Sequence, residues 1–197
     1  MRPLPFVWPY ALVFWATYMW AFLPEWKIVK GGMKGVKRAD SKDSGSMRVL
    51  LGGMWLALLV AFPLAFVRAW QFPRRAQLPM FAVAVSLILL GSLLRRYCWR
   101  TLGQYFTGDV RARRDQPVIR TGPYRLVRHP SYTGGMMMYI GIGLALGSWF
   151  SFALLTIATI ATYGYRVVIE ERALVDTIGD PYRSYMKESK RFVPYIV

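Results

Sequence analysis

The chain has little of the chemistry on which many small enzymes depend, with one cysteine and one histidine, His129, among 197 residues. A single cysteine excludes an intrachain disulfide framework and a multi-cysteine metal site. A single histidine argues against a zinc centre and a histidine-based triad, because no cluster of ligands or partners is available. No strand–Gly-x-Gly–helix unit of the dinucleotide-binding kind is present either. We therefore expect no bound metal and no Rossmann domain.

Apolar and basic residues, in contrast, are abundant. The chain is 55% hydrophobic, contains 8 Trp, 12 Tyr and 11 Phe, and has a formal net charge of +16. A soluble domain of this size could not hide so many aromatic side chains, whereas a membrane protein with basic loops combines both features. The length fits one domain, a small helical bundle.

Five apolar runs have about the length of membrane spans: residues 6–23, 49–67, 78–94, 132–146 and 149–168. The first run is too aromatic for a secretory signal peptide and lacks a charged leader and a small-residue cleavage site. Only Gly147 and Ser148 separate the last two runs, which predicts an antiparallel helical hairpin, and Gly143 and Gly147 are spaced to allow close helix contact. Residues 25–48 are rich in Lys, Gly, Ser and Asp and predict a solvated loop. The expected fold is an all-α integral membrane protein with about five transmembrane helices.

The basic residues predict the orientation. Of the 26 Lys and Arg residues, only Arg2, Arg68, Arg74 and Arg75 lie on one side of the five-span arrangement. The positive-inside rule therefore places the N-terminus outside and the C-terminus in the cytoplasm. The basic faces could also hold anionic lipid headgroups. Nucleic acid is a poor partner, because these charges border apolar spans and form no separate soluble face.

The stretch from Thr121 to Tyr132, Thr-Gly-Pro-Tyr-Arg-Leu-Val-Arg-His-Pro-Ser-Tyr, joins a basic segment to the predicted hairpin. Gly122-Pro123 predicts a turn, and Pro130 biases His129 away from helical backbone. Such a polar turn at the mouth of an apolar helix could grip a small polar ligand. It could equally be a basic connector whose arginines meet lipid phosphates.

A second cluster, Arg166, Glu170 and Glu171, lies at the inner end of the last apolar run. Arg166 and Glu170 are four residues apart and share one helix face. One interpretation is an exposed ion pair of little energetic value. The other is a polar pocket, in which His129, Tyr132 and Tyr124 on one wall meet Arg166 and Glu170 on the other, since ionisable groups at membrane depth usually face the bundle interior.

Five short motifs occur in a characteristic order: Leu102-Gly103, Gly122-Pro-Tyr-Arg-x-x-Arg-His-Pro-Ser-Tyr132, Arg166-x-x-x-Glu-Glu171, Gly179-Asp-x-Tyr-x-x-Tyr185 and Arg191-Phe-x-Pro194. Together they resemble the isoprenylcysteine carboxyl methyltransferase family, whose wider group includes the phospholipid N-methyltransferases. The resemblance covers about half of the chain. It implies one membrane domain, 1–197, with three N-terminal spans and loops in 1–101 and a methyltransferase-like core in 102–197.

The resemblance further implies that the protein uses S-adenosylmethionine, bound in a cytosol-facing pocket, to methylate a lipophilic acceptor that enters from the bilayer. By similarity, Glu170 would bind the cofactor through its ammonium group and Arg166 would hold the acceptor. The family often has His-x-Leu-Val where this chain has Gln116-Pro-Val-Ile, so a side-chain contact from Gln116 is less secure than backbone contacts. A further cofactor contact is expected near residues 109–111. The residues expected to line the cofactor are Gln116, Val118, Ile119, Tyr124, His129, Pro130, Ser131 and Tyr132.

The identity of the acceptor decides which residues are catalytic. A carboxylate is already a nucleophile at neutral pH, so Arg166 would only have to position it, through a bidentate pair. An amine acceptor would have to lose a proton, and Glu171 is then the candidate base. The carboxylate of an isoprenylcysteine is the acceptor we expect.

Several alternatives are open at this point. They are a phospholipid, another amine or a thiol as acceptor, an NADPH-dependent sterol- or isoprenoid-reductase-like activity, and a non-catalytic protein that keeps the pocket for a lipid or partner. The compact form and the absence of targeting signals favour a prokaryotic inner membrane.

Overall fold

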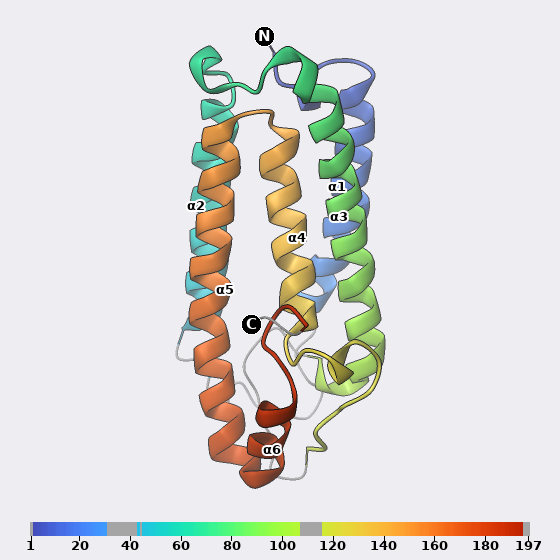
Figure 1. Cartoon of the computed structure of the whole chain (residues 1–197), viewed down its shortest axis with the longest axis vertical. Coiled ribbons are helices and arrows are strands. Elements are labelled where there is room, and N and C mark those ends of the chain that lie inside the picture. Colours follow the sequence, from blue (N-terminus) through green and yellow to red (C-terminus); the bar gives the residue numbers. More distant parts are fainter. Residues whose placement is uncertain (1, 31–42, 44, 107–115, 195–197) are drawn as a thin grey trace.

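The helices α1 to α5 run side by side along the long axis of the molecule, and α6 lies at its lower end as drawn in Figure 1. The structure, a computed structural model, describes residues 2–30, 43, 45–106 and 116–194, and only the backbone at 26–30. The helices are α1 (Tyr10–Lys30), α2 (Ser46–Leu64), α3 (Arg74–Leu102), α4 (Pro130–Ala145), α5 (Trp149–Ile178) and α6 (Asp180–Glu188).

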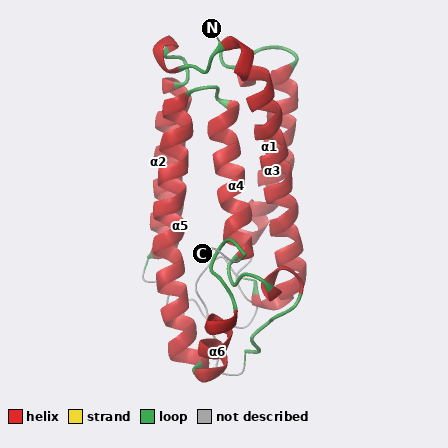
Figure 2. Ribbon diagram, viewed as in Figure 1, coloured by secondary structure: helices red, strands yellow, loops and turns green. Residues whose placement is uncertain are grey.

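Every regular element of the described residues is a helix, with short 3-10 turns between the long ones (Figure 2). Within the described part of the chain, strand-like pairing is limited to two isolated bridges, Gln71 with Ser148 and Val127 with Lys190. The all-α prediction is confirmed.

Three of the described helical stretches are long and apolar enough to cross a membrane: Ser46–Leu64, Arg74–Tyr105 and Trp149–Ile178. Large apolar side chains point outward from them; Trp55, Leu59 and Ile157 are 68%, 72% and 66% exposed. A surface of this kind suits lipid and not water. The chain is an integral, multi-pass membrane protein. Helices α1 and α4 correspond to the other two predicted spans, α4 with only 16 residues, and the count of five stays a prediction.

Glycines bring helix α3 against α4. A Cβ atom on Gly91 would lie 2.5 Å from the carbonyl oxygen of Gly134, and one on Gly141 would lie 2.8 Å from that of Ala84. Small residues at such crossings let two backbones approach closely within a membrane. Around this contact the core is apolar, with Ile88, Met138, Ile142 and Leu155 among its buried residues.

The substitution Gly91→Ala should lower the free energy of unfolding by about 1–3 kcal/mol, because the added methyl group meets backbone atoms that cannot move aside. The matched control is Gly52→Ala on α2, where an added Cβ meets nothing within 4 Å. That variant should be neutral or gain up to about 1 kcal/mol from better helix propensity. Unfolding of both variants in mixed detergent measures the difference, and equal stabilities would contradict this close contact.

The hairpin predicted at Gly147 and Ser148 is present between α4 and α5. Gly147 makes the turn with a left-handed φ of 67°, a conformation that favours glycine. The predicted close helix contact occurs at Gly143, where a Cβ would lie 3.0 Å from the Cα of Phe152. Gly147 itself takes no part in that contact.

The predicted loop at residues 25–48 was wrong at both of its ends. Helix α1 continues through Pro24 to Lys30, and α2 begins at Ser46. Polar residues at these positions form buried contacts with other helices, described below, and such contacts outweigh the low helix propensity of the segment. Helix α3 likewise extends beyond the predicted span 78–94, to Leu102.

Candidate active site

The turn singled out in the sequence lies where α4 begins. Gly122 has a φ of 57° and starts the 3-10 helix Gly122–Arg125. His129 has φ −124° and ψ 50°, outside the helical region, as the following proline predicts. Pro130 is the first residue of α4, so the helix starts directly after the histidine.

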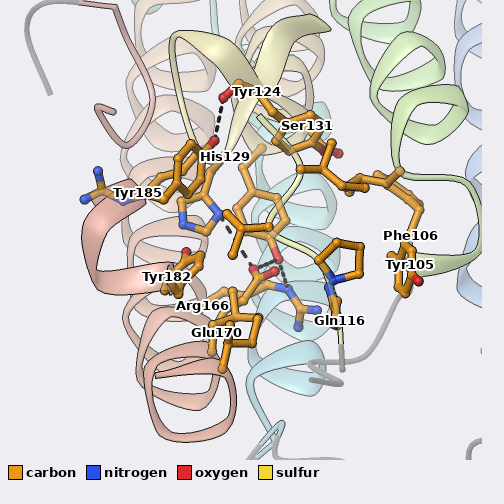
Figure 3. Close-up of a pocket in the computed structure, with 18 of the residues that line it drawn as sticks. Tyr105, Phe106, Gln116, Tyr124, His129, Ser131, Arg166, Glu170, Tyr182 and Tyr185 are labelled. Carbon is orange, nitrogen blue, oxygen red and sulfur yellow. Dashed lines mark hydrogen bonds and ion pairs between the residues drawn. The ribbon is translucent and has the colours of Figure 1, made fainter. Parts of the chain in front are cut away.

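A pocket opens at this end of the bundle (Figure 3). Its volume is about 1150 Å³, the space at its mouth included. Six parts of the chain contribute to its walls: the start of α2, the end of α3, residues 116–119, the start of α4, the end of α5, and α6. The predicted site residues among its lining are Gln116, Val118, Ile119, Tyr124, His129, Ser131, Tyr132, Arg166 and Glu170.

Two predicted site residues are not part of this lining. Pro130 is the first residue of α4 and is buried there. Glu171 lies behind the pocket and is described below. The expected contact near residues 109–111 lies outside the described residues.

The hydroxyl of Tyr132 joins Arg166 and Glu170, the two charged residues that share one face of α5. Its hydroxyl accepts a hydrogen bond from Arg166 Nε at 2.8 Å and donates one to Glu170 Oε2 at 2.5 Å. The side chain of Arg166 is 3% exposed and that of Glu170 is 27% exposed. The interpretation as an exposed ion pair at a helix end was therefore wrong, because Arg166 is buried and its charge is held by a polar network.

His129 lies between two carboxylates. Its Nε2 is 3.2 Å from Glu171 Oε1, and its Nδ1 is 3.8 Å from Glu170 Oε2. The ring stacks on Tyr132, with centroids 5.5 Å apart and an interplanar angle of 3°. The sole histidine is thus fixed as part of the pocket wall.

Glu171 anchors arginines from two segments of the chain. Its oxygens accept hydrogen bonds from Arg128 Nε at 2.5 Å and from Arg191 Nη2 at 2.9 Å. The side chain is 5% exposed. This position does not favour the general base predicted for an amine acceptor, because both oxygens are already engaged by arginines and Glu171 is not part of the pocket lining.

The segment after α6 closes over the start of α4. Backbone amides of Arg128 and His129 donate to the carbonyl oxygens of Lys190 and Arg191 at 2.8 and 3.0 Å. The hydroxyl of Thr133 donates to the carbonyl of Phe192 at 2.8 Å. The pocket wall formed by residues 127–133 therefore depends on a segment far along the chain. No local sequence pattern indicates this pairing.

Arg95 is a lining residue that the sequence analysis missed. Its guanidinium forms an ion pair with Glu25 of α1 and donates from Nη1 to the carbonyl oxygen of Ser131 at 3.0 Å and to its hydroxyl at 3.2 Å. The side chains of Arg95 and Glu25 are only 12% and 20% exposed. The available signal was a cation that directly follows the apolar run 78–94.

Three tyrosines complete the wall near α6. The hydroxyl of Tyr185 donates to the carbonyl oxygen of Tyr124 at 2.6 Å. Burial raises the pKa of Tyr185 to about 12 and raises the pKa of Tyr124 and of Tyr182 well beyond the usual range. All three phenols therefore remain neutral at physiological pH and offer aromatic surface and hydroxyl groups to a ligand.

These features define a class, an integral multi-pass helical membrane protein with a polar, charge-lined pocket at one end of its bundle. The chain belongs to the phospholipid methyltransferase family, whose model matches residues 79–180, just over half of its length. The matched region runs from α3 into the first residue of α6 and includes Tyr132, Arg166 and Glu170.

Curated relatives agree with this family. The protein-S-isoprenylcysteine O-methyltransferase of Schizosaccharomyces pombe is 32% identical over 115 residues, 57% of this chain and 49% of that protein. The protein-S-isoprenylcysteine O-methyltransferase B of Arabidopsis thaliana is 27% identical over 114 residues, 57% of this chain and 58% of that protein. The chain spans about half the length of the curated relatives it matches. The predicted resemblance to the isoprenylcysteine carboxyl methyltransferase family is confirmed.

A solved structure is similar in fold. The eukaryotic intramembrane Ras methyltransferase, isoprenylcysteine carboxyl methyltransferase, matches with a TM-score of 0.56 and 22% sequence identity over 82% of this chain and 55% of that chain. Both proteins therefore have the same helical arrangement over most of the present chain.

Proposed function

We propose that this protein transfers a methyl group from S-adenosylmethionine to the carboxylate of a lipophilic acceptor of the isoprenylcysteine type. One observation carries the proposal: the pocket presents a carboxylate, Glu170, and a guanidinium, Arg166, joined through Tyr132. Opposite charges held a short distance apart suit a donor with an ammonium group and an acceptor with a carboxylate. The names of the curated relatives support the same reaction.

The residues of the pocket fit S-adenosylmethionine. Glu170 is the partner for an ammonium group, since its carboxylate is fixed by Tyr132 yet remains 27% exposed. Residues 116–119 and Tyr124 line the same pocket and would contact the purine of the cofactor. When bound, the cofactor would supply a methyl group activated on a positively charged sulfur. The chain has to align it with the acceptor and exclude water.

Arg166 would hold the acceptor carboxylate. Apolar side chains at the start of α2, Met47 and Leu50, line the same pocket and suit an isoprenoid chain. The predicted bidentate contact has to be revised, because Nε and Nη1 of Arg166 already donate to Tyr132 and Asp43. A bidentate pair with the acceptor would displace one of these partners.

A carboxylate acceptor is better supported than an amine. An amine would require a base beside the pocket, and the candidate residue, Glu171, is bonded to Arg128 and Arg191. A carboxylate requires no base.

Within this proposal the chain forms one domain, with five spans, an outer N-terminus and the pocket on the cytoplasmic side, as the positive-inside rule predicts.

Titration of the purified protein with S-adenosylhomocysteine tests the proposal. We expect saturable binding by the wild type and a loss of affinity of about 10- to 100-fold in Glu170→Gln, which removes a charged hydrogen-bond acceptor. The matched control is Asp176→Asn, an exposed carboxylate on the same helix, which should bind like the wild type. A folded wild type that binds NADPH and not S-adenosylhomocysteine would overturn the proposal in favour of a reductase.

A further inference from the structure

Arg166 is held from two sides by different segments of the chain. Its Nε donates to the hydroxyl of Tyr132 on α4 at 2.8 Å. Its Nη1 donates to Asp43 Oδ1 at 3.0 Å and to the hydroxyl of Ser46 at 3.1 Å. The guanidinium plane is therefore defined by two contacts at different nitrogen atoms, one toward α4 and one toward the start of α2.

Asp43 is itself firmly anchored. Its Oδ1 accepts a hydrogen bond from the hydroxyl of Ser46 at 2.6 Å, and its Oδ2 accepts one from the backbone amide of Met47 at 3.0 Å. The backbone amide of Ser46 donates to the carbonyl oxygen of Asp43 at 2.8 Å. A carboxylate at this place also suits the start of a helix, where backbone amides point outward. The side chain is 14% exposed and cannot swing away from Arg166 without breaking these bonds.

The same helical turn carries apolar residues of the pocket. Met47 follows Ser46 directly, and Leu50 lies one turn further along α2; both line the cavity next to Arg166. Asp43 thus connects the apolar wall of the pocket with the guanidinium. A shift of the first turn of α2 would move both at once.

We propose that Asp43 is a positioning residue for the acceptor: it fixes the orientation of Arg166 and ties it to the first turn of α2. The inference rests on the proposed function, in which Arg166 holds the acceptor carboxylate. Arginine has a long, rotatable side chain, and a fixed guanidinium loses less freedom when a carboxylate binds. Asp43 is not among the residues that line the pocket, so it would act through Arg166.

The test compares Asp43→Ala and Asp43→Asn with the wild type, using an N-acylated S-farnesylcysteine as acceptor. We expect Asp43→Ala to lower kcat/KM for the acceptor by about 10- to 100-fold, because the guanidinium loses its charged partner at Nη1 and keeps there only the hydroxyl of Ser46, which Asp43 no longer orients. The Kd of S-adenosylhomocysteine should stay within about two-fold, because Glu170 keeps its hydrogen bond from Tyr132 in this variant. Asparagine keeps a side-chain oxygen that can accept from Nη1, so Asp43→Asn should recover most of the loss.

A double-mutant cycle separates this role from a general effect on the fold. In an Arg166→Lys background, Asp43→Ala should change kcat/KM by no more than about two-fold, because the residue through which it acts is already altered. An undiminished effect in that background would show a merely structural role and overturn the inference. A lower KM in Asp43→Ala would also overturn it, since Asp43 would then compete with the acceptor.

Different experimental results would refute the role of Asp43 and the proposed function. A wild type that methylates the farnesylated acid, together with an Asp43→Ala variant of equal kcat/KM, refutes the role of Asp43 alone. A folded wild type that binds S-adenosylhomocysteine and leaves the acid unmethylated refutes the carboxylate acceptor and the role of Asp43 with it.

Discussion

Arg166→Lys lowers kcat/KM for a prenylated-cysteine acid by about 10²-fold or more, the loss expected when a reacting group is misplaced. A lysine keeps the positive charge but has one nitrogen, and it cannot bond Tyr132 and Asp43 in the geometry that the guanidinium adopts. Arg166 does not bind the donor in our proposal, so S-adenosylhomocysteine should still bind. Methyl transfer from a labelled cofactor, measured beside a titration with S-adenosylhomocysteine, gives both quantities.

The control for this substitution lies on the same helix. Arg172 is exposed, and Arg172→Lys should leave turnover and binding unchanged. If Arg166→Lys were as active as Arg172→Lys, the fixed orientation of the guanidinium would have no part in catalysis. If it also lost S-adenosylhomocysteine binding, Arg166 would belong to the donor site.

The second large effect concerns stability. Glu171→Ala should lower the free energy of unfolding by about 3–5 kcal/mol, because it leaves the buried guanidinium of Arg128 without its counter-charge. Arg128, 10% exposed, loses its carboxylate partner, and so does Arg191 on the segment that closes over α4. The expected result is earlier unfolding in mixed detergent and faster tryptic cleavage at the segment 186–194.

The comparison variant is Glu188→Ala. Glu188 pairs with Arg120 at 2.6 Å, but both side chains are well exposed, at 57% and 40%. An exposed pair contributes about 0–1 kcal/mol, so this variant should unfold close to the wild type. Equal losses in the two variants would mean that burial of the Glu171 cluster adds nothing to stability.

Local patterns in the sequence predicted one half of the site. Gly122 and Pro130 indicated a turn before a helix, and the spacing of Arg166 and Glu170 placed both on one face of the next helix. Since the two helices form a hairpin, these residues converge in one pocket, as the structure has them. Short-range rules were sufficient here because the turn at Gly147 brings the helices together.

The other half depended on contacts between distant segments. Glu25 and Arg95 are separated by 70 positions, and Asp43 and Arg166 by 123. Neither pair is related by a helical period, so a single sequence carries no indication of their proximity. In both pairs the acid comes from a region rich in glycine and charge or from its border, and such composition ordinarily indicates a solvated loop.

The pairing of residues 190–192 with the start of α4 has a consequence for the biogenesis of the protein. The backbone and side-chain donors of Arg128, His129 and Thr133 find their acceptors 59 or more positions later in the chain. During synthesis, α4 emerges from the ribosome before those acceptors do. The ligand-binding end of the protein is therefore completed last, and a chain that ended before residue 190 would lack the acceptors that hold the start of α4.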